Sequence, residues 1–194
     1  MLAFEDDYKF NLYSATAQHN KVTLTDGETV KWVGYVTPSL YDIGYEARYE
    51  DLDIDCIDGL STLQYYKYEA LDDMKSSKSL LDIILHILKK CNCYNNLYIQ
   101  KNVTLDNEEE LYHRLYLNQS LFFEDDADIE DGVRITDDDD TYKDALEKIL
   151  TYLGVTLYAE GEDCYIVDFD CLKQRKSEYY KVSILDGTIQ PTEQ

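Results

Sequence analysis

Two cysteines and one histidine form the only group in this sequence whose types and spacing suit a soft metal ion. Cys91 and Cys93 are separated by one residue, and His86 precedes them by about one helical turn. Thiolate and imidazole groups are the usual ligands of zinc. A structural zinc site needs four ligands, and no second pair stands at a recognisable spacing. We therefore expect no metal at these residues.

Residues 124–140 form the most acidic stretch, with ten carboxylates and a single basic residue, Arg134. A calcium loop of the EF-hand type that began at Asp126 would need glycine at its sixth position. Asp131 stands there instead, and Gly132 follows one place late. The stretch is typical of a solvated acidic loop. An irregular cation site remains an alternative.

Catalytic patterns are sparse. The sequence has no G-x-S-x-G, H-E-x-x-H, P-loop or G-x-G-x-x-G motif. Its three histidines, His19, His86 and His113, are scattered, and His86 lies near an apolar stripe where a packed role is expected. Paired carboxylates are uninformative in a chain this acidic. We predict no catalytic residue and no cofactor.

Charge and composition limit the possible partners. The chain of 194 residues has 40 acidic and 18 basic side chains, which gives a net charge of -22. Such a surface repels phosphate backbones and anionic membranes, so direct nucleic-acid binding and membrane association are not expected. Hydrophobic residues make up 44% of the chain, which indicates a folded protein. The beginning, MLAFEDDYKF, does not resemble a signal peptide, so we expect the chain to stay in the cytoplasm where it is made.

The odd number of cysteines argues against a disulfide framework. Since no C-x-x-C pair occurs and the cytoplasm is reducing, we expect five free thiols. Two of them, Cys56 and Cys164, fall on the apolar phase of predicted strands, where free cysteine behaves as a small hydrophobic residue. The five are Cys56, Cys91, Cys93, Cys164 and Cys171.

Alternating apolar residues predict strands in the first 70 residues. Strands are expected at 8–12, 22–24, 30–36 and 51–56, and the pair Asp26-Gly27 predicts a hairpin between the second and the third. In the third strand, Val30, Trp32 and Val36 should form the buried face, with Lys31 and Tyr35 on the other. Pro38 should end this strand, since proline cannot donate to a ladder.

The period changes to that of a helix after residue 70. Apolar stripes predict helices at 80–91 and 141–153, and Asn92 and Gly154 can take their left-handed caps. Each helix leads into a strand, at 97–100 and 155–159. A shift of 62 residues superimposes the two apolar stripes, which suggests a duplicated helix-strand unit. A hairpin through Gly161 should follow the second strand.

These elements predict an α+β protein. Its antiparallel β-rich N-terminal region, either barrel-like or an open sheet, should cover residues 1–70. Residues 71–194 should form a region of helices and a β-hairpin that includes the acidic loop at 124–140. The strands and the Asp58-Gly59 turn should share a core, made of Trp32, Leu52, Ile54, Leu60 and Leu63.

One combination of residues resembles a known family. A strand of the pattern aromatic-x-Gly-hydrophobic-hydrophobic, then Pro and Tyr, precedes a strand that ends in an Asp-Gly-Leu-x-x-Leu turn. This resembles the hub and baseplate proteins of tailed bacteriophages, which are usually much longer. With a weaker likeness at 142–167, it covers about a third of the chain. The matching residues are Trp32, Gly34, Tyr35, Val36, Pro38, Tyr41, Asp58, Gly59, Leu60 and Leu63.

The resemblance implies a non-enzymatic structural component of a phage or prophage tail. Such a protein would contact other tail or baseplate proteins, form a homo-oligomer in the assembly, and pass from the host cytoplasm to the virion tail. Nineteen tyrosines favour an interaction surface. One alternative is an acidic mimic of DNA that occupies a host nucleic-acid-binding protein. A second is a domain associated with a cell-wall-degrading tail enzyme.

Overall fold

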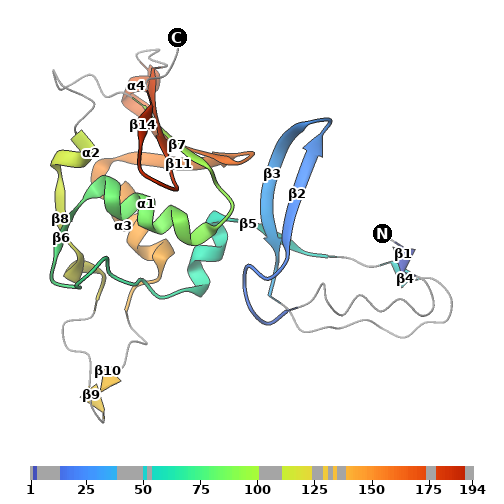
Figure 1. Cartoon of the computed structure of the whole chain (residues 1–194), viewed down its shortest axis with the longest axis horizontal. Coiled ribbons are helices and arrows are strands. Elements are labelled where there is room, and N and C mark those ends of the chain that lie inside the picture. Colours follow the sequence, from blue (N-terminus) through green and yellow to red (C-terminus); the bar gives the residue numbers. More distant parts are fainter. Residues whose placement is uncertain are drawn as a thin grey trace.

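The structure is a computed structural model of the whole chain. It describes residues 2–3, 14–38, 50–51, 54–100, 111–123, 129–130, 133–134, 139–173 and 178–190. Helices and strands both occur, and the sheets are mainly antiparallel and open, which confirms the α+β class. A hairpin stands beside a body made of helices and a larger sheet (Figure 1).

A five-stranded sheet organises the body. Its order is β11-β12-β7-β13-β14, and all neighbours are antiparallel except β12 and β7. One face is apolar and buried, with Leu97, Ile99, Cys164, Ile166 and Val182 in the core. The strands are β7 (Asn96–Gln100), β11 (Val155–Glu160), β12 (Asp163–Asp168), β13 (Tyr179–Ser183) and β14 (Ile189–Gln190).

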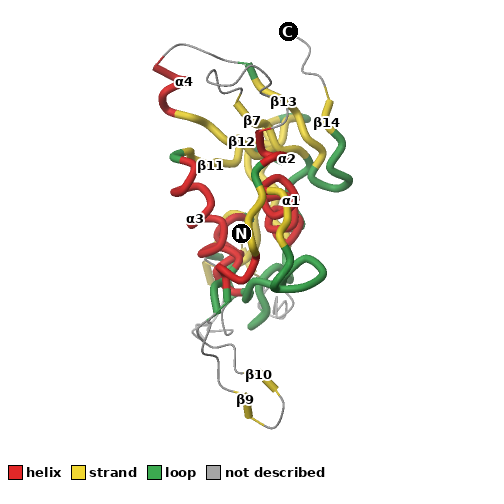
Figure 2. Tube along the Cα trace, turned by 90° about the vertical axis from the view of Figure 1, so that its left-hand side faces the viewer, coloured by secondary structure: helices red, strands yellow, loops and turns green. Residues whose placement is uncertain are grey.

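Two amphipathic helices supply the other half of this core. Helix α1 (Leu80–Cys91) and helix α3 (Tyr142–Leu153) lie next to each other below the sheet strands (Figure 2). Ser79 caps α1 by accepting from Asp82 N, and Thr141 forms a capping box with Asp144 at α3. Asn92 and Gly154 end the helices with φ of 52° and 69°, as predicted.

The predicted hairpin is confirmed. Strands β2 (Lys21–Asp26) and β3 (Thr29–Val36) are antiparallel, and Gly27 takes the left-handed φ of 61° in the two-residue turn. A short third strand, β5 (Cys56–Asp58), pairs only with residues 34–36 of β3. The sheet order β2-β3-β5 leaves β2 as an edge strand.

The predicted buried face of β3 is right only in part: Val36 is buried and Val30 packs against the core, but Tyr35 is also buried and Trp32 is not part of the core. Leu24 pairs with Trp32 and Thr25 with Val30, so Lys31 is an extra residue in a β-bulge. The bulge places Val30 on the same face as the buried Val33 and Tyr35, which join the core with it. Trp32 falls on the other face and is only partly buried outside this core.

A continuous strand over 51–56 is also wrong. Residues 54 and 55 lie outside any strand, and Leu52 lies outside the described residues. The cause is the length of β3, which ends at Val36. Thr37 N still donates to Asp55 O at 2.8 Å, but Pro38 has no N–H to continue the ladder. Ile54 is therefore partly buried outside the core, whereas Leu63 is fully buried and Leu60 packs against the core.

Shorter elements complete the body. Strands β6 (Ser77–Ser79) and β8 (Tyr116–Asn118) pair beside the 3-10 helix η4 (Gln119–Phe122), and the 3-10 helix η2 (Leu60–Tyr65) follows β5. The remaining elements are β1 (Leu2–Ala3), which pairs with β4 (Glu50–Asp51), β9 (Ile129–Glu130), which pairs with β10 (Val133–Arg134), α2 (Leu111–Arg114) and α4 (Phe169–Lys173).

The core spans the predicted division at residue 70. Val33, Tyr35 and Leu63 pack in one cluster with α1, α3 and the large sheet. These shared contacts do not mark a boundary at residue 70, so the division into 1–70 and 71–194 stays a prediction. The duplication also stays a prediction, because the strands that follow the two helices occupy different positions in the sheet: β7 is an inner strand and β11 is an edge strand. The strand expected at 8–12 lies outside the described residues. In the part of the chain that the structure describes, no helix is long and apolar enough to cross a membrane.

Candidate interaction site between the hairpins

A cleft of about 320 Å³ lies between the β2–β3 hairpin and the β11–β12 hairpin. The two hairpins approach closely at the Gly161 turn, because a Cβ on Gly161 would lie only 2.7 Å from the carbonyl O of Val30. Beyond that contact the cleft separates β3 from the edge strand β11. Its walls are Trp32, Val33, Asp58, Leu60, Tyr94, Tyr158, Ala159 and Gly161.

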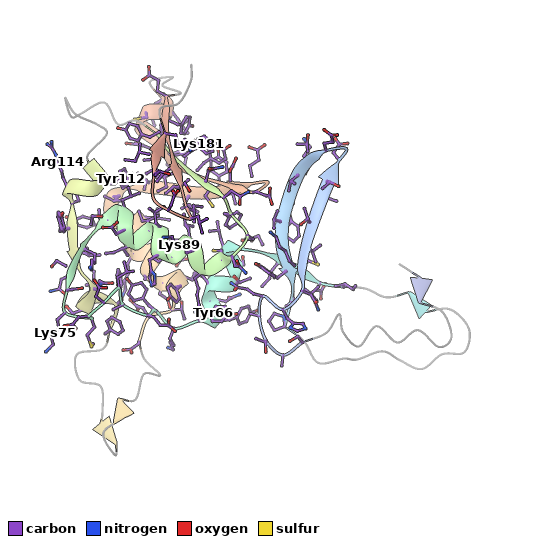
Figure 3. All side chains as sticks on the ribbon, in the orientation of Figure 1. Tyr66, Lys75, Lys89, Tyr112, Arg114 and Lys181 are labelled. Carbon is purple, nitrogen blue, oxygen red and sulfur yellow. The ribbon has the colours of Figure 1, made fainter. Side chains whose placement is uncertain are left out.

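The base of the β2–β3 hairpin is fixed to the body by hydrogen bonds. The Tyr35 hydroxyl lies 2.9 Å from the carbonyl O atoms of both Cys91 and Asn92, which are left without helical partners at the end of α1. Tyr66 points from the body towards the hairpin (Figure 3), where its hydroxyl donates to Ala17 O at 2.9 Å. Gln18 Nε2 donates to Lys90 O at 2.8 Å.

The Trp-x-Gly pattern has a steric cause in this hairpin. The indole of Trp32 lies over Gly34, since a Cβ at Gly34 would be 2.4 Å from the Trp32 Cη2 atom. The same Cβ would be 2.1 Å from Ile57 O on the paired strand β5. Only glycine fits between the indole and the neighbouring backbone.

The Asp58-Gly59 turn has an equally specific geometry. The two Asp58 carboxylate oxygens accept from the Ser61 N–H and hydroxyl at 2.8 Å each, at the start of η2. Gly59 is buried beneath Cys93 and Tyr94, and its Cβ would lie 2.1 Å from the Cys93 Sγ atom. The pattern Asp-Gly-Leu therefore packs the turn directly against the loop between α1 and β7.

Seven of the ten residues of the resemblance meet around the cleft, whereas Val36 and Pro38 do not; Val36 is buried at the end of β3 but is not part of the cleft lining. Trp32, Asp58 and Leu60 line the cleft, while Gly34, Tyr35, Gly59 and Leu63 support its walls from behind. Pro38 lies past the end of β3, away from the cleft lining. Tyr41 lies outside the described residues.

All five cysteines are free thiols. Cys91, Cys93 and Cys164 are buried near one another, and burial raises the pKa of each thiol, that of Cys93 to about 12. Neutral thiols are poor metal ligands. Cys56 is exposed, which corrects its expected place on a buried face: β5 begins only at Cys56, the last residue of the predicted strand.

Among the residues with a described position, no group of three or more His, Cys, Asp or Glu side chains is placed to hold a metal ion. Asp126, Asp131 and Gly132 lie outside the described residues, so the cation alternative there stays open.

His86 belongs to a separate aromatic cluster on the body. Its Nε2 atom lies 2.7 Å from Glu69 O and 3.2 Å from the Tyr142 hydroxyl, and its ring packs edge-on against Tyr68. Burial lowers the pKa of His86. The packed role expected from the sequence is therefore what the structure shows.

This environment predicts a pH dependence of stability. The folded state keeps His86 neutral, so below about pH 6.5 the unfolded chain binds a proton that the folded chain does not. The contribution of His86 should be complete above that pH and should diminish as the pH falls. Urea unfolding at pH 7.5 and 5.5 should show wild type losing stability relative to His86→Gln. The exposed His19 supplies the control variant His19→Gln, and an equal pH response in wild type and His86→Gln would contradict the prediction.

Four residues form a row across the other face of the large sheet. Tyr158, Tyr165, Tyr98 and Lys181 stand directly opposite one another on β11, β12, β7 and β13. The rings of Tyr98 and Tyr165 stack with centroids 4.9 Å apart, and those of Tyr165 and Tyr158 stack at 5.1 Å. The Lys181 Nζ atom lies 5.9 Å from the Tyr98 ring centroid. Tyr158, at the end of this tyrosine row, lines the cleft.

Tyr94 and Tyr158 are site residues that the sequence did not indicate. Tyr158 follows the exposed phase of a predicted strand, between Leu157 and Ala159, and this alternation could have placed it on the outer face. Tyr94 lies in a loop, where no periodicity exists to place it.

Comparison of the chain with models of protein families, with curated protein sequences and with solved structures found no match.

Proposed function

We propose that this chain is a non-enzymatic structural component of a phage or prophage tail or baseplate hub. One observation supports this most directly. The residues that resemble the hub family build a rigid joint, and this joint holds a hairpin whose outer strand is open to another chain. Their task is mechanical, because they fix backbone positions.

Strand β2 has the features of an assembly edge. Within the described part of the chain it pairs with β3 on one side only, and five of its six side chains are exposed. Leu24 is 61% exposed on this strand. An unpaired edge of this kind can accept a strand from a second chain through main-chain hydrogen bonds.

The partners in this proposal are other tail or baseplate proteins and further copies of the chain. Stacked tyrosines on the large sheet add contact area with few torsions to freeze. The net charge of -22 would let DNA pass a ring of such chains without binding. The protein would assemble in the host cytoplasm and remain in the virion tail.

Association measurements on edge variants test this proposal. Native mass spectrometry and sedimentation of the purified chain, alone and with the proteins encoded by adjacent genes, should reveal a complex. A stable contact should bury on the order of 1,000 Å² or more. Leu24→Lys on β2 should weaken association about tenfold or more, because a charge on the edge opposes strand addition. The control is Leu185→Lys, at a leucine that is 83% exposed in the turn after β13.

Two outcomes would contradict the proposal. One is equal association of the Leu24→Lys and Leu185→Lys variants. The other is a chain that joins no tail protein and instead captures a basic DNA-binding host protein in a salt-sensitive manner. That second outcome would favour the DNA mimic, for which the net charge is the supporting observation.

A further inference from the structure

The tyrosine row on the large sheet ends at a lysine on one side and at an exposed tyrosine ring on the other. Lys181 stands beside Tyr98, where its ammonium group interacts with the ring. At the other end, Tyr158 stacks on Tyr165 and is 43% exposed. Because β11 is the edge strand, no further strand among residues with a described position lies beyond Tyr158 in this sheet. The open end of the row lies in the cleft.

The opposite wall of the cleft offers a second aromatic ring and a carboxylate. Trp32 contributes the ring from β3, and Asp58 contributes the carboxylate from the end of β5. Each Asp58 oxygen accepts one bond from Ser61, which leaves lone pairs on both oxygens. Burial raises the pKa of Tyr94 on the floor of the cleft, and nearby groups, with Asp58 the weakest of them, add to that rise.

The floor of the cleft is the side chain of Tyr94, which is 7% exposed. Its hydroxyl oxygen is buried from solvent, so a ligand in the cleft meets the ring and not the oxygen.

We propose that the cleft is a binding site for a guanidinium group, supplied by an arginine side chain of a neighbouring protein. A guanidinium is planar and weakly hydrated, so it can stack on Tyr158 or Trp32 while its N–H groups donate to the Asp58 carboxylate. An ammonium ion holds its water more strongly and cannot stack. The volume of about 320 Å³ admits a side chain but not a folded segment. Only the source of the arginine rests on the proposed function.

The single tryptophan makes this proposal directly measurable. Trp32 is the only tryptophan in the chain and lines the cleft, so its fluorescence reports on the site alone. Titration with N-acetyl-arginine amide should give a saturable change, with a Kd on the order of 1 mM for so small a probe. N-acetyl-citrulline amide has nearly the same shape without the charge. It should bind about tenfold more weakly or not at all.

Two variants with matched controls locate the site. Asp58→Asn should weaken binding of N-acetyl-arginine amide about tenfold, and Asp55→Asn should not, since the exposed Asp55 makes the same charge change outside the cleft. Tyr158→Leu should also weaken it, whereas Tyr152→Leu should not, because Tyr152 is 84% exposed on α3. Circular dichroism confirms that each variant is folded. If Asp58→Asn fails to fold, Tyr158→Leu decides.

Three results would overturn the proposal: no change in Trp32 fluorescence with the arginine probe, equal binding of the citrulline probe, or unchanged binding by a folded Tyr158→Leu variant. Each can be told apart from failure of the tail proposal. The probe titration tests the cleft of the isolated chain, whereas the Leu24→Lys experiment tests association through β2.

Discussion

Gly34→Ala is expected to lower the free energy of unfolding by about 3 kcal/mol. The added Cβ would lie 2.1 Å from Ile57 O and 2.4 Å from the Trp32 indole. The first of these atoms belongs to the backbone of β5 and cannot rotate away. Relief of the clash must therefore separate β3 from β5 and disturb the cleft. Urea unfolding followed by circular dichroism measures the loss.

Gly154→Ala is the matched control for this prediction. Gly154 has a φ of 69°, but no atom lies within 4 Å of its would-be Cβ. The substitution introduces only backbone strain, which costs about 1 kcal/mol. Equal losses of stability for the two variants would show that the Cβ atom added at Gly34 does not clash with its neighbours.

The sequence predicted the elements whose determinants are local. Helix α1 follows from an apolar stripe between Ser79 and Asn92, and α3 from a stripe between Thr141 and Gly154. Each pair of caps acts within one turn of its helix, so no knowledge of the rest of the chain is needed. The hairpin at Gly27 is local in the same sense.

The buried face of β3 could not be predicted in full, because a β-bulge shifts the alternation of its side chains by one residue. A strict alternation assigns Val30 and Trp32 to one face. The extra residue at Lys31 separates them, and the Tyr35 hydroxyl on the core face donates to Cys91 O at the end of α1. That contact joins residues more than fifty positions apart, and periodicity contains no information about it.

The candidate site was predicted only in part, because some of its contacts also join residues that are far apart in the sequence. The pattern around Trp32 and the Asp58-Gly59 turn indicated residues that do meet in space. Their counterpart, Tyr158 on the β11–β12 hairpin, is more than 120 positions away from Trp32. The hairpin itself was predicted, but its approach to β3 depends on sheet order. Sheet order is a tertiary property that a single sequence does not reveal.

Gln119→Leu should cost about 4 kcal/mol of stability, more than any surface change in this chain. Gln119 is fully buried, and its Oε1 atom accepts from the Leu71 N–H at 2.8 Å and the Tyr68 hydroxyl at 2.9 Å. Its Nε2 atom donates to Leu71 O and Ser76 Oγ at 2.9 Å each. Leucine has a similar volume but leaves these groups unpaired, at about 1–3 kcal/mol for each buried group.

Gln190→Leu makes the same chemical change at an exposed position on β14 and should alter stability by less than about 0.5 kcal/mol. Urea unfolding of both variants separates loss of the hydrogen-bond network from any general effect of added apolar surface. A Gln119→Leu variant as stable as wild type would mean that water molecules supply the hydrogen bonds that Gln119 makes to the loop at 71–76. In that case the loop that Gln119 holds against η4 would depend on apolar packing around Tyr68 and Phe122 instead.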